Sequence, residues 1–282
     1  MPPHPTPSPQ NADEEQSGTV LETEDERREP SAAQGAQIPV APPVDRRASE
    51  QPSRPYHPTA RPPVALLTVL DDGRTDGELI RIRADRFVIG RSEGDFRLPH
   101  DMQVSARHVE ILRYRIGDRY RWVITDLQTP NGLFIRVSRT ALADQAEFLV
   151  GSGRYRFEAV KSDLLGSSDS FPSTSTRPPA ADPSAARQPA IVELAGDKTL
   201  FRFPLTGREY WIGRDSACAI CRANDPFVEA RHACLSRDGN DAWHARNNKS
   251  ANGLWYRVPQ ITVDEACLFQ IGEQRFRLRI RN

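Results

Sequence analysis

The chain has 282 residues, and because its 38 Lys and Arg residues balance its 38 Asp and Glu residues, its formal net charge is zero. Proteins whose main task is to bind nucleic acid usually carry a basic excess, so this composition argues against a nucleic-acid partner. No stretch approaches the roughly 20 apolar residues that cross a bilayer, and the first ten residues resemble no secretory signal. We therefore expect a cytoplasmic protein without membrane insertion.

The first 63 residues contain 14 prolines and a single aromatic residue, Tyr56. A segment with so little apolar surface cannot offset the entropy of ordering its backbone. Residues 1–63 are therefore predicted to be a disordered, Pro-rich tail.

Between residues 64 and 160, short runs of strand length cluster or alternate apolar residues, and turn sequences such as DDG, PNG and GSG separate them. No run has a sustained period of 3.6 residues. Many short strands at regular spacing indicate an all-β sandwich or barrel. The runs are VALLTVL from Val64, ELIRIRA from Glu78, RFVIG from Arg86, HVEILRY from His108, RWVITDL from Arg121, GLFIRV from Gly132, EFLVG from Glu147 and RYRFEAV from Arg154.

The second half of the chain repeats this pattern after a Ser-, Pro- and Ala-rich stretch, residues 161–189, which predicts a flexible linker. IGRS recurs as IGRD, ARHVEI as ARHACL, and PNGLFIRV as ANGLWYRV, at offsets between 121 and 124 residues. Near-constant offsets indicate a duplicated domain. We predict one domain at 64–160 and a second at 190–282.

All four cysteines lie in the second half, and Cys218 and Cys221 form a Cys-x-x-Cys pair. A zinc site would need a second close pair, whereas Cys234 and Cys267 stand singly. Each cysteine also lies in or beside an apolar run. We therefore expect buried, small hydrophobic side chains rather than a metal site.

Three short motifs follow one another in the first repeat. They are Gly90-Arg91, then Ser105-Ala106-Arg107-His108, then Asp126-Leu127-Gln128-Thr129-Pro130-Asn131-Gly132. This order resembles the forkhead-associated (FHA) family, whose pattern is Gly-Arg, Ser-Arg-x-His and Asp-Leu-x-Ser-x-Asn-Gly. The resemblance covers about residues 64–160 and again 190–281.

The resemblance implies a β-sandwich of about eleven strands whose loops at one end bind a phosphothreonine peptide. Arg91 and Ser105 match the positions that contact phosphate, Asn131 matches the contact to the peptide backbone, and Thr129 matches a small hydroxyl position. These residue types suit the task, because a guanidinium offers a rigid fork of donors and an amide offers both a donor and an acceptor. His108 matches a histidine that is mostly architectural.

The first repeat departs from the family pattern at two positions. Ala106 stands where a cation or an asparagine often helps to hold the phosphate, and the arginine comes one residue later, as Arg107. If this segment is extended, Ser105 and Arg107 project to the same side, and Arg107 either substitutes for the missing cation or points elsewhere. Pro130 replaces the residue before Asn131. We expect these changes to affect affinity more than binding itself.

The second repeat departs further. It retains Arg214, Arg231, Ser250 and Asn252, but Glu229 occupies the position of Ser105. A carboxylate repels a phosphate and can pair with Arg214 instead. We therefore predict a degenerate second domain that binds phosphate weakly or not at all and contacts a partner or the first domain.

The tail holds two threonines, Thr19 and Thr23, within the acidic stretch SGTVLETEDE. One interpretation is a solubilising acidic patch. In the other, which resembles some bacterial FHA proteins, a phosphorylated tail threonine occupies the chain's own domain, where tethering provides a high effective concentration.

These features together predict a non-enzymatic adaptor without a cofactor, which recruits a threonine-phosphorylated partner such as a Ser/Thr kinase or its substrate. The alternative is a phosphate-independent scaffold built from two FHA folds. The adaptor needs both Arg91 and Ser105 at the loop apex, whereas the scaffold does not. Nucleic-acid binding would need a basic stripe on one sandwich face.

Overall fold

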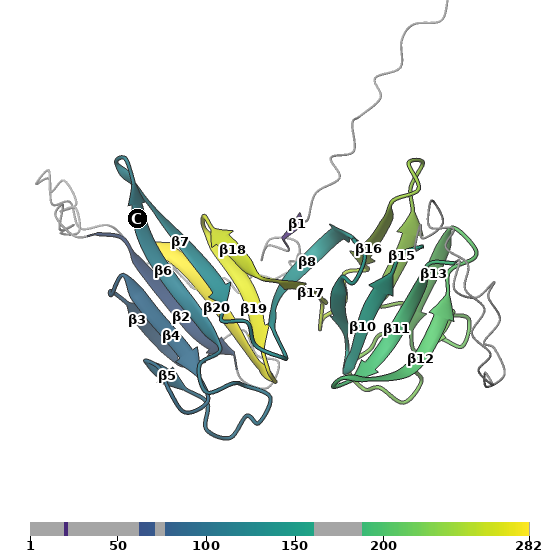
Figure 1. Ribbon diagram of the computed structural model, residues 1–282, viewed down its shortest axis with the longest axis horizontal. Coiled ribbons are helices and arrows are strands. Elements are labelled where there is room, and N and C mark those ends of the chain that lie inside the picture. The colour runs from purple at the N-terminus through teal and green to yellow at the C-terminus, as the bar shows by residue number, and fades with distance from the viewer. Residues whose placement is uncertain (1–19, 22–61, 71–76, 161–187, 282) are drawn as a thin grey trace, which may run out of the picture. The chain divides into compact units, whose positions relative to one another are not determined.

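A computed structural model of the chain describes residues 20–21, 62–70, 77–160 and 188–281. Every regular element in these ranges is a β-strand, which confirms the all-β class (Figure 1). Nearly all of the predicted tail and linker, with Thr19 and Thr23, lies outside the described residues. Each of the eight predicted runs of the first repeat contains a strand. No helix in the described ranges is long and apolar enough to cross a membrane.

The chain forms two compact units, and each unit combines strands of both sequence repeats. Of the described residues, the Arg91 unit contains 62–70, 77–133 and 258–281, and the Glu229 unit contains 20–21, 134–160 and 188–257. The sequence is duplicated as the repeats 64–160 and 190–282. In the structure, however, the last strands of each repeat belong to the unit that contains the first strands of the other repeat. We refer to this arrangement as the strand exchange.

The Arg91 unit contains two sheets. One has the order β3-β2-β20-β19 and is antiparallel; the other has the order β18-β7-β6-β4-β5, in which only the β4–β5 pair is parallel. The strands from the first repeat are β2 (Val64–Leu70), β3 (Leu79–Ile82), β4 (Arg86–Gly90), β5 (Phe96–Arg97), β6 (Val109–Ile116) and β7 (Arg119–Asp126). Those from the second repeat are β18 (Gln260–Val263), β19 (Ala266–Ile271) and β20 (Gln274–Arg281).

In the Glu229 unit the strand order is β12-β11-β10-β9-β17-β8-β16-β15-β13-β14, and β1 pairs with β8. The first repeat supplies β8 (Leu133–Ala141), β9 (Glu147–Val150) and β10 (Gly153–Glu158). The second repeat supplies β11 (Ala190–Ala195), β12 (Lys198–Pro204), β13 (Glu209–Gly213), β14 (Ile220–Cys221), β15 (Ala233–Arg237), β16 (Trp243–Asn247) and β17 (Leu254–Val258), while β1 (Val20–Leu21) comes from the start of the chain.

Alternating side chains build both cores. In β10, Gly153, Tyr155 and Phe157 are buried and the residues between them are half-exposed, as a strand with one face in the core requires. In the Arg91 unit, Trp122 from the first repeat and Phe269 and Phe276 from the second are fully buried. Because a buried aromatic side chain contributes about 1.5–3 kcal/mol, the exchanged strands are an integral part of each core.

Candidate functional site

The predicted residues of the first repeat gather in three loops of the Arg91 unit. Arg91 follows the end of β4, Ser105 and Arg107 precede β6, and Thr129 and Asn131 follow β7. Because β4, β6 and β7 are antiparallel neighbours, the end of β4, the start of β6 and the end of β7 lie at the same end of the sheet. This end of the sheet brings together residues that lie up to 40 positions apart in the sequence.

Backbone hydrogen bonds join the first two loops. The Arg91 amide donates to the Ser105 carbonyl at 2.8 Å, and the Glu93 amide donates to the Ala106 carbonyl at 2.9 Å. The two predicted phosphate-contacting residues, Arg91 and Ser105, are therefore held side by side by their own backbones.

The His108 ring joins the second and third of these loops. Its ring is fully buried, its Nδ1 accepts the Ser105 amide at 3.1 Å, and its Nε2 lies 3.0 Å from the Gly132 carbonyl oxygen and 2.9 Å from the Thr129 hydroxyl. Because Nδ1 accepts a hydrogen bond, Nε2 carries the proton and donates. The Thr129 hydroxyl donates in turn to Asp126 Oδ1 at 2.7 Å. His108 and Thr129 thus hold the loops in place by hydrogen bonds.

Arg91 borders an open space. The residue is half-buried, its Nη1 lies 3.8 Å from Met102 Sδ, and no carboxylate of the described residues forms an ion pair with it. The space beside it measures about 490 Å³ and is lined by Arg91, Ser92, Arg97, Pro99 and Met102. Two guanidinium groups therefore border one space, and the sequence had suggested only the first of them.

Asn131 and Arg107 differ in how they are held. Asn131 Nδ2 donates to the Gln103 carbonyl at 2.8 Å, which ties the third loop to the segment before Ser105. Residues 106 and 107 form a bend and Ser105 belongs to no strand, so the expected alternation that would place Arg107 beside Ser105 does not apply. The Arg107 side chain is exposed.

The Glu229 unit has the same hydrogen bonds between its loops at the equivalent end of its sheet. The Arg214 amide donates to the Glu229 carbonyl at 2.9 Å, and the ring of the buried His232 accepts the Glu229 amide at 3.3 Å and lies 2.9 Å from the Gly253 carbonyl. Ser250 Oγ donates to Asn247 Oδ1 at 2.6 Å. The scaffold of the loops is therefore retained in both units.

The side chains around these loops are arranged differently. Glu229 Oε1 accepts the Ala251 amide at 2.7 Å, and within the described part of the chain no ion pair joins Glu229 to Arg214, so that expectation was wrong. The physical reason is that the backbone amide of Ala251 binds the Glu229 carboxylate in place of Arg214. The first repeat has no such donor, because Pro130 stands at the equivalent position and lacks a backbone N–H. The Arg231 guanidinium lies 5.6 Å from the Trp211 ring centroid and makes a cation–π contact. Asn252 Nδ2 donates to the Phe227 carbonyl at 3.0 Å.

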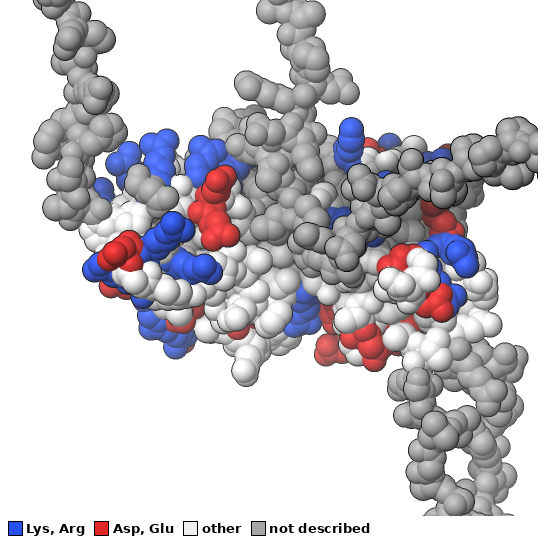
Figure 2. Space-filling view, turned by 90° about the horizontal axis from the view of Figure 1, so that it is seen from above, with Lys and Arg blue, Asp and Glu red and all other residues white. Residues whose placement is uncertain are grey.

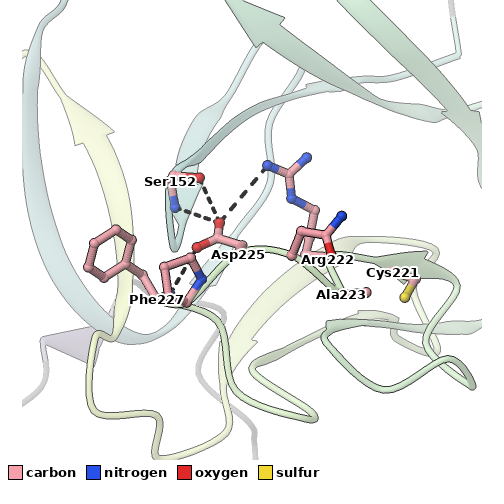
Figure 3. Close-up of a pocket in the computed structure, with 8 residues that line it drawn as sticks. Ser152, Cys221, Arg222, Ala223, Asp225 and Phe227 are labelled. Carbon is pink, nitrogen blue, oxygen red and sulfur yellow. Dashed lines mark hydrogen bonds and ion pairs between the residues drawn. The ribbon is translucent and has the colours of Figure 1, made fainter.

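Figure 3 shows a second space, of about 350 Å³, in the Glu229 unit, where Ser152 lies over Asp225. Asp225 Oδ2 accepts hydrogen bonds from the Ser152 amide at 2.9 Å and from the Ser152 hydroxyl at 2.7 Å. Burial would raise the pKa of Asp225, but the hydrogen bonds from Ser152 and Phe227 outweigh it and lower the pKa. Arg222 pairs with Glu193. The charges around this space are thus already matched by protein groups.

The cysteines correct one expectation. Cys218, Cys234 and Cys267 are buried, as predicted, and burial raises the pKa of the Cys267 thiol to about 12. Cys221 is exposed, because it alternates with the buried Ile220 in the two-residue strand β14. Among the residues that the structure describes, no three His, Cys, Asp or Glu side chains are grouped so that they could hold a metal ion.

His232 leads to a pH prediction. Burial, which disfavours the charged imidazolium, lowers its pKa below the ordinary value, and the hydrogen bond to Gly253 only partly opposes this shift. Since the unfolded chain binds the proton more readily, the unfolding free energy is expected to be constant above about pH 6.5 and to fall as the pH drops below it. Urea denaturation at pH 7.5 and 5.5 measures the difference. A dependence that is equally steep in a His232→Gln variant would contradict this assignment.

Charged side chains of both signs lie interspersed on the face shown in Figure 2. Together with the zero net charge, this distribution means that binding of an anion would depend on individual cations of the loops and not on a broad positive field.

Comparison with known proteins gives a consistent result. The model of the FHA domain family matches residues 87–151 and 210–272, which include the motifs of both repeats. No curated protein matches the chain. Among solved structures, the chain is similar to the FHA domain of CT664 from Chlamydia trachomatis, at 27% identity over 26% of this chain and 69% of that one, with a TM-score of 0.21.

Two further solved structures are similar. One comes from a structural and functional analysis of phosphothreonine-dependent FHA domain interactions, with 27% identity over 32% of this chain and 91% of that chain and a TM-score of 0.21. The other is Mycobacterium tuberculosis EmbR in complex with a low-affinity phosphopeptide, with 23% identity over 34% of this chain and 24% of that chain and a TM-score of 0.21. On the match of the family model to both repeats, the chain contains two forkhead-associated domains in tandem.

Proposed function

We propose that this chain is a non-enzymatic, cytoplasmic adaptor that binds a phosphothreonine of a partner protein through the Arg91 unit. FHA domains bind phosphothreonine in signalling, which gives the class of ligand. The observation that carries the proposal is Arg91, which borders an open space without an acidic partner among the described residues and whose amide is bonded to Ser105. A dianionic phosphate would supply the negative charge that this guanidinium lacks.

The roles of the other residues follow from their positions. Ser105 offers a hydroxyl beside Arg91, and Asn131, whose Nδ2 donates to the Gln103 carbonyl, is the candidate contact to the backbone of an extended peptide. Arg97, which lines the same space as Arg91, is a second candidate contact to the phosphate or to an acidic residue of the peptide. A Ser/Thr kinase or a kinase substrate is the kind of partner that presents such a group.

For the Glu229 unit we propose an interaction that does not need phosphate. Its carboxylate, fixed on the Ala251 amide, stands at the position of Ser105, and a phosphate there would meet a like charge. At about 4 Å such a repulsion amounts to about 4 kcal/mol at an effective dielectric constant of 20, and solvent screening reduces it.

This reasoning predicts the effect of Glu229→Ser. In an Arg91→Ala background, where the first site is disabled, this substitution is expected to raise the residual affinity for a phosphothreonine peptide about fivefold to tenfold. Isothermal titration of Arg91→Ala and of Arg91→Ala/Glu229→Ser with one peptide measures the difference. Equal affinities would show that Glu229 is not what keeps phosphate out of this unit.

The proposed function is tested by capture from a peptide library. The intact protein is immobilised and exposed to matched libraries that contain phosphothreonine, phosphoserine or unmodified threonine at a fixed position. We expect retention from the phosphothreonine library alone. Equal retention from the unmodified library would favour a phosphate-independent scaffold.

A further inference from the structure

We propose that the last strands of the chain, from the second repeat, position the phosphopeptide loops of the first repeat, and that side chains at two turns specify this strand exchange. The first part rests on the proposed function, whereas the second part concerns the fold alone. Both follow from contacts within each unit.

In the Arg91 unit, the contact is between Asp101 and the β19–β20 turn. Asp101 Oδ2 accepts the amide of Glu273 at 2.7 Å, and Asp101 Oδ1 accepts the amide of Gln103 at 2.9 Å. Gln103 Nε2 donates to Glu273 Oε1 at 3.2 Å, and the Gln103 carbonyl accepts Asn131 Nδ2 at 2.8 Å. A continuous series of hydrogen bonds therefore leads from the β19–β20 turn to the proposed peptide-binding Asn131.

The turn fits closely around Asp101. Gly272 has φ +56°, a conformation that favours glycine, and a Cβ atom added there would lie 2.4 Å from Asp101 Oδ2. The equivalent contact in the Glu229 unit joins Asp225 to the turn at Ser152, where Gly151 has φ +60° and an added Cβ would lie 2.2 Å from Val228 Cγ2. In both units, therefore, a turn of one repeat is hydrogen-bonded to an aspartate of the other repeat.

The two turns differ in chemistry, and each suits the aspartate that it meets. Ser152 brings a hydroxyl that donates to the buried Asp225, and Glu273 brings a carboxylate that accepts from Gln103. If each repeat kept its own strands, Glu273 would meet Asp225 and Phe227. Its carboxylate would then lose an amide donor and approach a like charge, which is unfavourable.

The adjoining core positions show the same complementarity. Tyr155 lies opposite Glu193, which pairs with Arg222, whereas Phe276 lies opposite Val69 and packs edge-on against Phe96 with the ring centroids 6.2 Å apart. Without the exchange, the phenol would face Val69 and the phenyl ring would face Glu193. The Tyr155 hydroxyl is buried without a hydrogen-bond partner among the described residues, but in the exchanged arrangement it lies near the charges of Arg222 and Glu193, which Val69 would not provide. The turn contacts therefore carry the argument, and this core position agrees with them.

Cysteine cross-linking tests the exchange directly. Thr125 pairs with Gln260 across β7 and β18, next to the hydrogen-bonded pair of Asp126 and Pro259, so their Cα atoms are about 4.5 Å apart, within the reach of a disulfide. The residue of the first repeat that is equivalent to Gln260 is Arg139. In a Cys221→Ser background, oxidised Thr125→Cys/Gln260→Cys is expected to form a disulfide, which peptide mapping detects, and Thr125→Cys/Arg139→Cys is not. The reverse result would overturn the exchange.

A protease site inserted in residues 161–189 provides a second readout on the same protein. After cleavage the two halves are expected to remain together in native gel filtration at the size of the 31.6-kDa chain, and the Thr125→Cys/Gln260→Cys disulfide is expected to hold them together in denaturant. Two folded halves that separate under native conditions would contradict the exchange.

A crossed pair of glycine variants tests the positioning of the site. Gly272→Ala, in the second repeat, is expected to lower the affinity for a phosphothreonine peptide about tenfold, whereas Gly151→Ala, in the same repeat as Arg91, is expected to leave it unchanged. Loss in Gly151→Ala alone would show that the first repeat keeps its own strands. Loss in neither variant would overturn the positioning role of the turn. If the unaltered chain binds no phosphopeptide, the proposed function fails, while the cross-links still decide whether the strands are exchanged.

Discussion

Arg91→Ala is expected to reduce the affinity of the intact chain for a phosphothreonine peptide by about tenfold to a hundredfold. A hydrogen bond to a charged group contributes about 1.5–3 kcal/mol, and each 1.4 kcal/mol corresponds to a factor of about ten in affinity. In the described residues no acidic side chain pairs with Arg91, so its removal leaves no buried carboxylate unpaired, and the measured loss reports on the ligand. Calorimetric titration with one peptide selected from the library measures the change.

The matched control is Arg214→Ala, at the equivalent position of the Glu229 unit. Because Arg214 is exposed and Glu229 stands beside its loop, this variant is expected to bind the peptide like the unaltered chain. A second variant, Arg91→Lys, keeps the charge but loses the planar fork of donors and is expected to recover only part of the affinity. Equal affinity of Arg91→Ala and the unaltered chain would remove Arg91 from the site.

His108→Ala is expected to lower the unfolding free energy of the Arg91 unit by about 2–5 kcal/mol and to abolish peptide binding. The ring accepts the Ser105 amide and reaches the Gly132 carbonyl and the Thr129 hydroxyl, all in a buried setting. Each buried group that loses its partner costs about 1–3 kcal/mol, and truncation of the ring leaves a cavity. Urea denaturation followed by residue-resolved NMR signals of the Arg91 unit measures the change.

His100→Ala provides the control for this variant. His100 is exposed in the same unit, and its replacement is expected to change the unfolding free energy by less than about 0.5 kcal/mol. If His108→Ala unfolded at the same urea concentration as His100→Ala, the loops at Ser105 and at Thr129–Gly132 would not depend on the buried ring.

The sequence predicts the strands well because alternation leaves a local signature. In β10, for example, every second residue is buried, as the run RYRFEAV indicates. The two-residue strand β5 leaves no such signature, and neither does the outward direction of Cys221 in β14. Both depend on which neighbour the strand finds, and that information is not local.

The candidate site was partly predictable for the same reason. Arg91, Ser105 and Asn131 follow or precede recognisable strands, so their convergence follows from the order of the sheet. Arg97 lies in the two-residue strand β5 and Gln103 in the loop between β5 and β6, and no periodic pattern there shows which side chain meets the space beside Arg91. The bend at residues 106–107 removes the expected alternation of Ser105 and Arg107, because residues 105–107 do not form a strand.

The strand exchange could not be read from the repeat pattern. The turns at Ser152 and Glu273 lie at the same spacing in the two repeats, so either repeat could supply the last strands of either unit. The choice depends on contacts between distant residues, Ser152 with Asp225 and Glu273 with Gln103. Such pairs become visible only when the chain is folded.

The most direct test of phosphate recognition by the Arg91 unit is a residue-resolved NMR titration of the intact chain with one threonine peptide in its phosphorylated and unphosphorylated forms. We predict that the phosphorylated peptide shifts the amide resonances of residues 90–107 and 128–132, and that the unphosphorylated peptide leaves them unchanged. Shifts confined to residues 213–231 and 248–253, or equal shifts with both peptides, would contradict phosphothreonine binding by this unit.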